Sequence, residues 1–101
     1  MILYNVTTNI DLSVQHEWLE WMKNVHIPEV MQTGMFLEFR FLKVLGDEDS
    51  GGATYSIQYT CESMQKFKEY ETNFAPALRK QMIEKYKDKF VAFRTLLEVV
   101  K

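Results

Sequence analysis

Apolar residues recur along this chain with two different periods, and the order in which these periods alternate constrains the fold most strongly. An apolar residue at every second position is typical of a half-buried strand, and four stretches show this period. They are residues 2–9, 35–45, 53–61 and 90–100. Apolar residues three and four positions apart predict helices with one buried face at residues 14–26 and 64–87. The expected order is therefore strand, helix, strand, strand, helix, strand.

Proline and glycine positions set the expected ends of these elements. Pro28 disfavours helical geometry in the residue before it, so we expect the first helix to end near His26. Pro28 is then expected to open a short second turn that ends at Gly34. Pro76 predicts a kink or a restart of the second helix. Residues 46–52 are rich in Gly and Asp, which is typical of a hairpin loop.

This order of elements predicts a fold of the α+β class. Two right-handed β-α-β crossovers joined by a hairpin form a ferredoxin-like β-α-β-β-α-β sandwich, with a four-stranded antiparallel sheet and the helices on one face. The expected strand order across the sheet is fourth, first, third, second. A chain of 101 residues with 47% hydrophobic residues is long and apolar enough for one domain, which we expect to span residues 1–101.

The alternation within the strands predicts two unlike sheet faces. The face expected to pack under the helices is apolar: Ile2, Tyr4, Val6, Leu37, Phe39, Phe41, Tyr55, Ile57, Tyr59, Val91, Phe93, Leu97 and Val99. The opposite face is expected to mix polar and charged residues with large apolar ones: Asn5, Thr7, Glu38, Arg40, Ser56, Gln58, Arg94 and Glu98, with Leu3, Phe36, Leu42, Val44, Ala92 and Leu96. This face has too many large apolar residues to be exposed to solvent, and too many charged residues to lie in a dry core.

A second copy of the chain is the partner that this mixed face predicts. Two sheets stacked face to face would form a dimeric α/β barrel, and the second and fourth strands, expected to be long and to lie at the edges, invite pairing. Arg94 is expected to pair with Glu38 of the partner subunit across the two-fold axis. The alternative is a monomer whose open face is merely apolar.

Composition argues against several classes of protein. Lys and Arg number 12 and Asp and Glu number 14, and this net charge of −2 gives no support for a nucleic-acid partner. The sequence contains no run of about 18 apolar residues, which a membrane span would need. The N-terminal residues lack the pattern of a secretory signal. Cys61 is the only cysteine, which favours a reducing compartment and hence a cytoplasmic protein. The two histidines have no acidic residues at a fixed spacing, so we expect no metal site.

Three segments resemble a known family: His26-x-Pro28, the run YSIQYTC at residues 55–61, and KFVAFRTLLE at residues 89–98. Together they resemble the bacterial family named domain of unknown function 4286, and the likeness covers nearly the whole chain. That family is similar to the dimeric α/β-barrel proteins, which include cofactor-free monooxygenases, haem-degrading enzymes and stress-response barrels. The resemblance implies the fold and the homodimer but carries no catalytic residues. The haem-degrading relatives use a histidine on a helix as axial ligand, and residues 64–87 contain none, so no cofactor is expected.

Charged and polar residues of the mixed sheet face are the candidate ligand-binding residues. They are Arg94, Glu38, Arg40, Glu98, Gln58 and Asn5, with Ser56 nearby. One interpretation is a pocket that fixes a polar or anionic small molecule inside the barrel. The other is a set of charges paired across the dimer interface, where they would fix its geometry.

His26 is the weak catalytic candidate. As a general base it would need to reach the barrel interior and to have an orienting partner, and the sequence identifies none. The alternative is a structural role at the end of the first helix. Arg79, with neighbouring lysines, is expected on a solvated face, and Cys61 is expected to be an inert buried thiol.

The sequence therefore predicts a cytoplasmic homodimeric barrel that binds a small molecule or serves in assembly, without a complete catalytic set. The alternative is a cofactor-free oxygenase or isomerase that acts on a small metabolite in the barrel interior. The sequence leaves open whether the protein is an enzyme.

Overall fold

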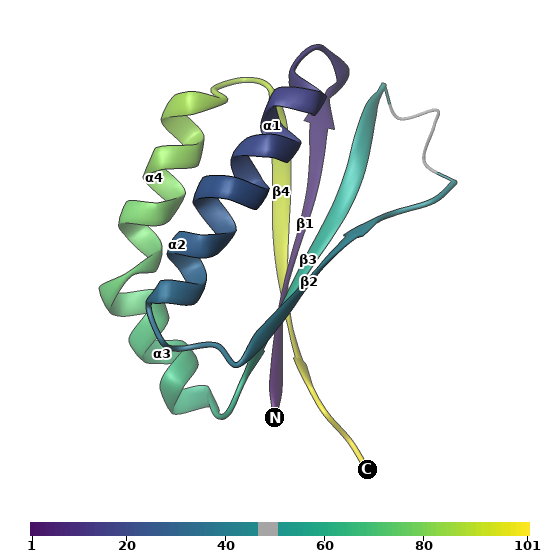
Figure 1. The fold of residues 1–101 in the computed structure, drawn as a ribbon. Helices are drawn as coiled ribbons and strands as arrows, with labels where there is room; N and C mark the ends of the chain where they lie inside the picture. Colours follow the sequence, from purple (N-terminus) through teal and green to yellow (C-terminus); the bar gives the residue numbers. More distant parts are fainter. Residues whose placement is uncertain (47–50) are drawn as a thin grey trace.

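The computed structural model describes residues 1–46 and 51–101, and Figure 1 shows them as a twisted sheet with helices packed on one face. The strands are β1 (Ile2–Asp11), β2 (Glu38–Lys43), β3 (Gly52–Cys61) and β4 (Phe90–Glu98). The helical elements are the 3-10 turn η1 (Leu12–Val14), α1 (Gln15–Trp21), the π turn η2 (Met22–His26), α2 (Ile27–Gln32), α3 (Met64–Asn73) and α4 (Ala75–Lys85). Neighbouring strands pair antiparallel in the order β2-β3-β1-β4. The predicted ferredoxin-like α+β fold and its strand order are confirmed.

The first helical segment does not end at His26, and that prediction was wrong. Ile27 keeps helical geometry (φ −61°, ψ −44°) directly before Pro28. The backbone N–H of Ile27 donates to the carbonyl of Met22, five residues earlier, so the chain forms one wider π turn. This turn carries α1 into α2 without a break and places Pro28 in the first turn of α2, where its missing N–H costs least.

The second helical segment restarts at Pro76 as predicted. Ser63 caps α3 by accepting a hydrogen bond from the backbone N–H of Lys66. Phe74 leaves helical geometry (φ −125°), and α4 begins at Ala75 with Pro76 in its first turn. Tyr86, just beyond the end of α4, is buried against the helices.

The second strand is shorter than predicted, because β2 begins only at Glu38. Phe36 therefore does not lie on the open sheet face, as the alternation suggested. It is 6% exposed and packs against the rings of Tyr4, Tyr59 and Tyr70 in the core. The expectation of a long edge at this strand is also wrong, since β2 has six residues. Residues 47–50 of the expected hairpin loop lie outside the described residues.

The fourth strand presents the opposite faces from those predicted. Residues directly opposite in an antiparallel pair share a face. Val6 lies opposite Arg94 and Thr7 lies opposite Phe93, so Arg94 is on the helix side and Phe93 is on the open side. Phe90, Ala92 and Leu96 are on the helix side with Arg94, and Val91 and Leu97 are on the open side with Phe93. Both alternations of β4 contain large apolar residues, so only its register with β1 decides between them.

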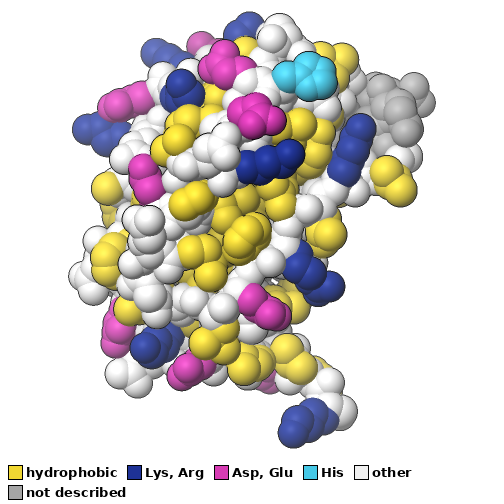
Figure 2. All heavy atoms as spheres, viewed as in Figure 1, with side chains coloured by type: hydrophobic (Ala, Val, Ile, Leu, Met, Phe, Trp, Pro, Cys, Tyr) yellow, Lys and Arg dark blue, Asp and Glu magenta, His cyan; other side chains and the backbone are white. Residues whose placement is uncertain are grey.

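Aromatic rings fill much of the space between the sheet and the helices. Tyr4 packs on Phe67 at 4.9 Å between ring centroids and on Tyr70 at 5.9 Å. Near the other end of β1, Trp18 is fully buried and packs on Tyr55 at 5.3 Å. Hydrophobic side chains also reach the surface along the seam between the helix layer and the sheet, with charged side chains around them (Figure 2).

Candidate functional site

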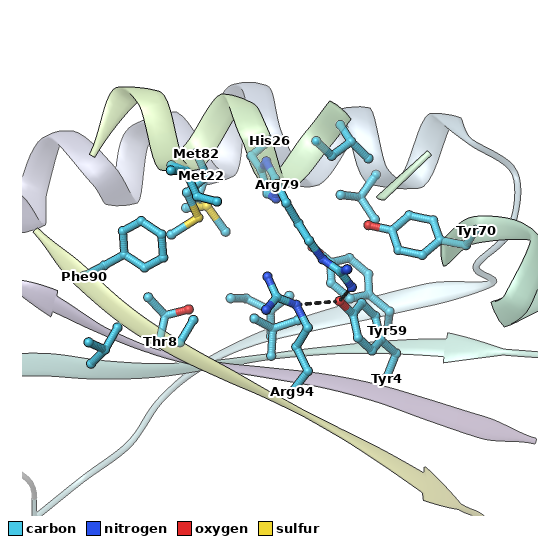
Figure 3. Close-up of a pocket in the computed structure, with 17 residues that line it drawn as sticks. Tyr4, Thr8, Met22, His26, Tyr59, Tyr70, Arg79, Met82, Phe90 and Arg94 are labelled. Carbon is cyan, nitrogen blue, oxygen red and sulfur yellow. Dashed lines mark hydrogen bonds between the residues drawn. The ribbon is translucent and has the colours of Figure 1, made fainter. Parts of the chain in front are cut away.

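A cavity of about 250 Å³ lies between the helices and the β1–β4 side of the sheet (Figure 3). The elements η2, α2, α3 and α4 line it from the helix layer, and all strands except β2 line it from the sheet. Much of its wall is apolar: Val6, Val30, Ile57, Leu78 and Ile83. Its polar side chains are Tyr4, Thr8, His26, Tyr59, Tyr70, Arg79 and Arg94. Apolar walls with converging polar groups are the usual composition of a small-molecule site.

Two arginines from opposite layers meet at one phenol in this cavity. Arg79 of α4 and Arg94 of β4 each donate to the hydroxyl oxygen of Tyr4, Arg79 through Nη2 and Arg94 through Nε, both at 3.0 Å. Figure 3 shows the two side chains approaching this hydroxyl from opposite sides. The phenol of Tyr4 is buried, so it holds both guanidinium groups at a fixed place in the wall.

The two arginines differ in whether a carboxylate neutralises their charge. Arg79 forms an ion pair with Glu71 at 2.6 Å. Burial acts to lower the pKa of Arg79, but the hydrogen bonds that Arg79 donates to Glu71 and Tyr4 outweigh it and raise this pKa. Arg94 has no carboxylate partner in the part of the chain that the structure describes, and its side chain is exposed at the mouth of the cavity. Arg94 therefore leaves positive charge available at the cavity.

His26 lines the cavity from the helix side. Its ring stacks on the indole of Trp21, with 5.1 Å between centroids and 27° between planes. Its Nδ1 atom is buried and has no hydrogen-bond partner among the residues that the structure describes. Burial, with a smaller contribution from the positive charge of Arg94, lowers the pKa of His26 to about 4, so the imidazole is neutral at pH 7. The π turn brings both its first and its last residue, Met22 and His26, to the cavity wall.

An apolar end faces these polar groups across the cavity. Phe90 of β4 lies beside the thioethers of Met22 and Met82, on the side away from Tyr4 and Tyr70 (Figure 3). Methionine side chains adapt to the shape of a bound apolar group. The cavity thus combines a cationic region with an adaptable apolar region.

The structure separates the residues that the sequence grouped on one sheet face. Arg94 lies in the cavity, on the helix side. Glu98 also falls on the helix side of β4, opposite Ile2 at the far end of the sheet. The remaining four lie on the open face: Glu38, Arg40, Gln58 and Asn5. The expected pairing of Arg94 with Glu38 of the partner subunit does not fit this arrangement, because the two side chains leave the sheet on opposite sides.

The open-face residues form a hydrogen-bonded polar strip of their own. Arg40 donates to Gln58 at 3.1 Å, and Ser56 donates to Asn5 at 2.5 Å. Asn5 in turn donates to the hydroxyl of Thr7 at 3.2 Å. This strip runs across β2, β3 and β1 on the face without helices.

Sequence reasoning missed Tyr4 and Arg79 as functional residues. Tyr4 was assigned to the core, where its ring does lie, but its hydroxyl faces two cations. Arg79 was expected on a solvated face with the neighbouring lysines. Its spacing from Met82 and Ile83, three and four positions on, is the signal that places it beside the apolar stripe of α4.

Within residues 1–46 and 51–101, no group of three or more His, Cys, Asp and Glu side chains is placed to hold a metal ion. None of the helices in these ranges has the length and apolar character that a membrane crossing requires.

Sheet order, helix layer and cavity together define a ferredoxin-like α+β protein with a candidate ligand site between its helices and its sheet. The chain belongs to the family described as Domain of unknown function (DUF4286), whose model matches residues 1–100, as the resemblance predicted. No curated protein matches the chain.

Solved structures share the fold at low sequence identity. A dimeric ferredoxin-like protein from an uncultured marine organism is 12% identical with a TM-score of 0.72, covering 100% of this chain and 96% of that chain. A suggested antibiotic biosynthesis monooxygenase from Deinococcus radiodurans is 13% identical with a TM-score of 0.73, covering 100% and 94%. A variant of MhuD with two manganese protoporphyrin IX molecules bound per active site is 19% identical with a TM-score of 0.70, covering 100% and 96%.

Proposed function

We propose that this protein binds a small organic acid in the cavity between its helices and its sheet, with the anionic group at Arg94 and the apolar body against Phe90, Met22 and Met82. The observation that carries the proposal is the meeting of Arg79 and Arg94 at the hydroxyl of Tyr4. Two cations with one carboxylate, Glu71, leave a net positive charge in an otherwise neutral and apolar cavity.

The chemistry of the cavity wall sets the class of ligand. A guanidinium binds a carboxylate through parallel, charge-assisted hydrogen bonds, and Arg94 presents such a group at the mouth of the cavity. A cavity of about 250 Å³ has room for a compound of about one aromatic ring with a short acidic chain. A neutral compound of the same shape would leave Arg94 without a counter-charge and is expected to bind more weakly.

The protein is proposed to work as a homodimer through the open sheet face. Val91 and Phe93 of β4 are 71% and 62% exposed there, beside the polar strip of Asn5 and Gln58. Monomeric proteins rarely expose large apolar groups side by side on one sheet face. A second copy stacked on this face would cover them and leave the polar strip in the middle. With its single, buried thiol, Cys61, such a dimer suits the cytoplasm.

A second candidate function is that of a cofactor-free isomerase or oxygenase acting in the same protein. The observation that favours it is His26, a neutral imidazole that lines the cavity and whose Nδ1 has no hydrogen-bond partner among the described residues. Binding and catalysis would then use one site.

Matched compounds test the binding proposal. Phenylacetate and phenylacetamide have the same shape and differ in charge, whereas acetate keeps the charge and lacks the ring. In calorimetric titrations we expect phenylacetate to bind at least about tenfold more tightly than either of the others. Arg94→Gln is expected to remove this preference. Arg40→Gln, a change of the same kind on the open face, is expected to leave it. Equal binding of the acid and the amide, or no binding of any acid, would overturn the proposal.

A further inference from the structure

We infer that this cavity is catalytic and that His26 is its base, which takes a proton from the carbon beside the keto group of a small aromatic 2-oxo acid and so interconverts its keto and enol forms. The inference rests on the proposed binding of an aromatic acid at Arg94. It adds to that proposal a reaction, a substrate class and a catalytic residue.

The placement of three kinds of group around the cavity carries the inference. His26 enters from the helix layer, the Arg79–Tyr4–Arg94 group lies toward the sheet, and Phe90 with the methionines closes the apolar end (Figure 3). A flat acid with its carboxylate at Arg94 and its ring at Phe90 places the carbon between these two groups in the middle of the cavity. His26 lines this same cavity, so the inference assigns it as the group that reaches that carbon.

The state of His26 is suited to a base. Its Nδ1 is buried and has no partner in residues 1–46 and 51–101, and Trp21 covers one face of the ring, which limits the ways the ring can turn. The charged and titratable groups that line the cavity with it are Arg94 from β4, Arg79 from α4, Tyr4 from β1, Tyr59 from β3 and Tyr70 from α3, and of these Arg94 acts on its pKa. Since burial and Arg94 both favour the neutral imidazole, one ring nitrogen carries a lone pair at pH 7. An anion bound at Arg94 offsets the repulsion of that cation and makes the imidazole more basic when the ligand is present.

The weak basicity of His26 restricts the substrate. A carbon beside a carboxylate alone holds its proton too firmly for a neutral imidazole. A carbon between a keto group and an aromatic ring is far more acidic, because both neighbours delocalise the electron pair that remains. An aromatic 2-oxo acid has this carbon, together with the carboxylate for Arg94 and the ring for Phe90.

The step balances without an oxidant or a cofactor. The C–H bond breaks, its proton passes to a ring nitrogen of His26, and its electron pair forms the carbon–carbon double bond of the enolate. The electron pair of the keto double bond moves onto oxygen, where the guanidinium groups stabilise the negative charge. The imidazolium then gives its proton to that oxygen, which yields the enol and restores neutral His26.

Phenylpyruvate is the probe for this step. We expect the wild-type protein to speed the exchange of its C3 protons with D₂O, followed by NMR, and the appearance of the enol, followed by ultraviolet absorbance. His26→Asn is expected to slow the catalysed exchange by about 100-fold or more, which is the usual contribution of a general base. Its Kd for phenylpyruvate should stay within about threefold of the wild-type value. His16→Asn, which removes the exposed histidine of α1, is the matched control and should change neither.

The outcomes separate this inference from the binding proposal. If phenylpyruvate does not bind, the proposed function fails. If phenylpyruvate binds through Arg94 but exchanges no faster than in buffer, or equally fast with His26→Asn, the inference fails and the binding site stands. Should His26→Asn not fold, the pH profile of wild-type exchange at saturating phenylpyruvate decides. A base on the protein gives a plateau toward neutral pH, whereas a rate that keeps rising in proportion to hydroxide overturns the inference.

Discussion

Trp21 and His26 form a stacked pair, with 5.1 Å between their ring centroids and 27° between their planes. The indole belongs to α1 and the imidazole closes the π turn η2, so the pair joins the two parts of the first helical segment. The stack keeps water from one face of His26 and orients the ring toward the cavity. Burial of this histidine has a consequence for the stability of the whole protein.

Stability is expected to fall in mild acid because of His26. Burial, with a smaller contribution from Arg94, lowers its pKa from 6.5 to about 4 in the folded protein, so the unfolded chain binds this proton more readily. The contribution of neutral His26 is complete above about pH 6.5 and is lost progressively as the pH falls toward 4. The loss amounts to about 3 kcal/mol at most. Urea denaturation of the wild-type protein between pH 4 and 7 measures it.

Two variants isolate this effect from the carboxylates that titrate nearby. In His26→Asn the free energy of unfolding should depend less on pH than in the wild-type protein over the same interval. His16→Asn removes an exposed histidine and should follow the wild-type curve. Parallel curves for all three proteins would mean that His26 is as easily protonated in the folded state as in the unfolded chain.

Tyr4→Phe is expected to destabilise the protein by about 2 kcal/mol. The hydroxyl of Tyr4 accepts one hydrogen bond from each of two guanidinium groups, and bonds to charged groups contribute about 1.5–3 kcal/mol when buried. The bond from Arg94 contributes less because that side chain is exposed. Tyr70→Phe is the control, since the hydroxyl of Tyr70 makes no hydrogen bond to another described residue. A loss of stability for Tyr70→Phe as large as for Tyr4→Phe would contradict the role given to the shared oxygen.

The sequence was sufficient for the fold and insufficient for the site, for reasons that particular elements show. In β1 and β3 polar and apolar residues alternate cleanly, so their faces and the strand order followed from the pattern. In β4 Phe90 and Val91 are both apolar, as are Leu96 and Leu97, so alternation alone could not assign the face of Arg94. Only pairing with β1, a contact between distant parts of the chain, decides it.

The position of His26 over the cavity also could not be predicted from the sequence. Pro28 correctly signalled a disturbance of the helix, but a helix can end there or widen by one residue, and the tertiary packing of η2 decides which. His26 was therefore expected at a helix end and lies instead within a continuous segment over the cavity. Arg79 and Tyr4 have no motif in common, and their contact joins residues 75 positions apart.

Phe93→Glu is expected to convert the proposed dimer into a monomer. Phe93 is 62% exposed on the open sheet face, and a charge buried there against a second copy would have no partner. Light scattering coupled to size-exclusion chromatography measures the mass. Leu12→Glu places the same charge at a residue of similar exposure, 57%, in η1 and should leave the mass unchanged.

Arg94→Ala, in contrast to Phe93→Glu, is expected to leave the proposed dimer intact. Because Arg94 leaves β4 on the helix side, its loss should weaken ligand binding and leave the mass at that of the wild-type protein. If Arg94→Ala separates the subunits while Phe93→Glu does not, the open face is not the interface.

Gly52→Ala is expected to destabilise the protein by about 1–3 kcal/mol, although it only adds a methyl group at the first residue of β3. A Cβ atom at this position would collide with the side-chain oxygen of Asn9 and lie 2.7 Å from the backbone oxygen of Ile10. The backbone oxygen belongs to the central strand β1, which is paired on both sides and cannot move aside without loss. Thermal unfolding should show a drop of about 4–8 °C for each kcal/mol.

Gly34→Asn is the matched control for this substitution. Gly34 has φ of +76° and open space where a Cβ would lie, and asparagine tolerates this backbone region better than other residues with side chains. Its melting temperature should therefore stay close to that of the wild-type protein. If Gly52→Ala were equally well tolerated, the start of β3 would be free to shift against β1. The pairing of Asp11 with Gly52 would then contribute little to the register that places Tyr4, and through it the two arginines, at the cavity.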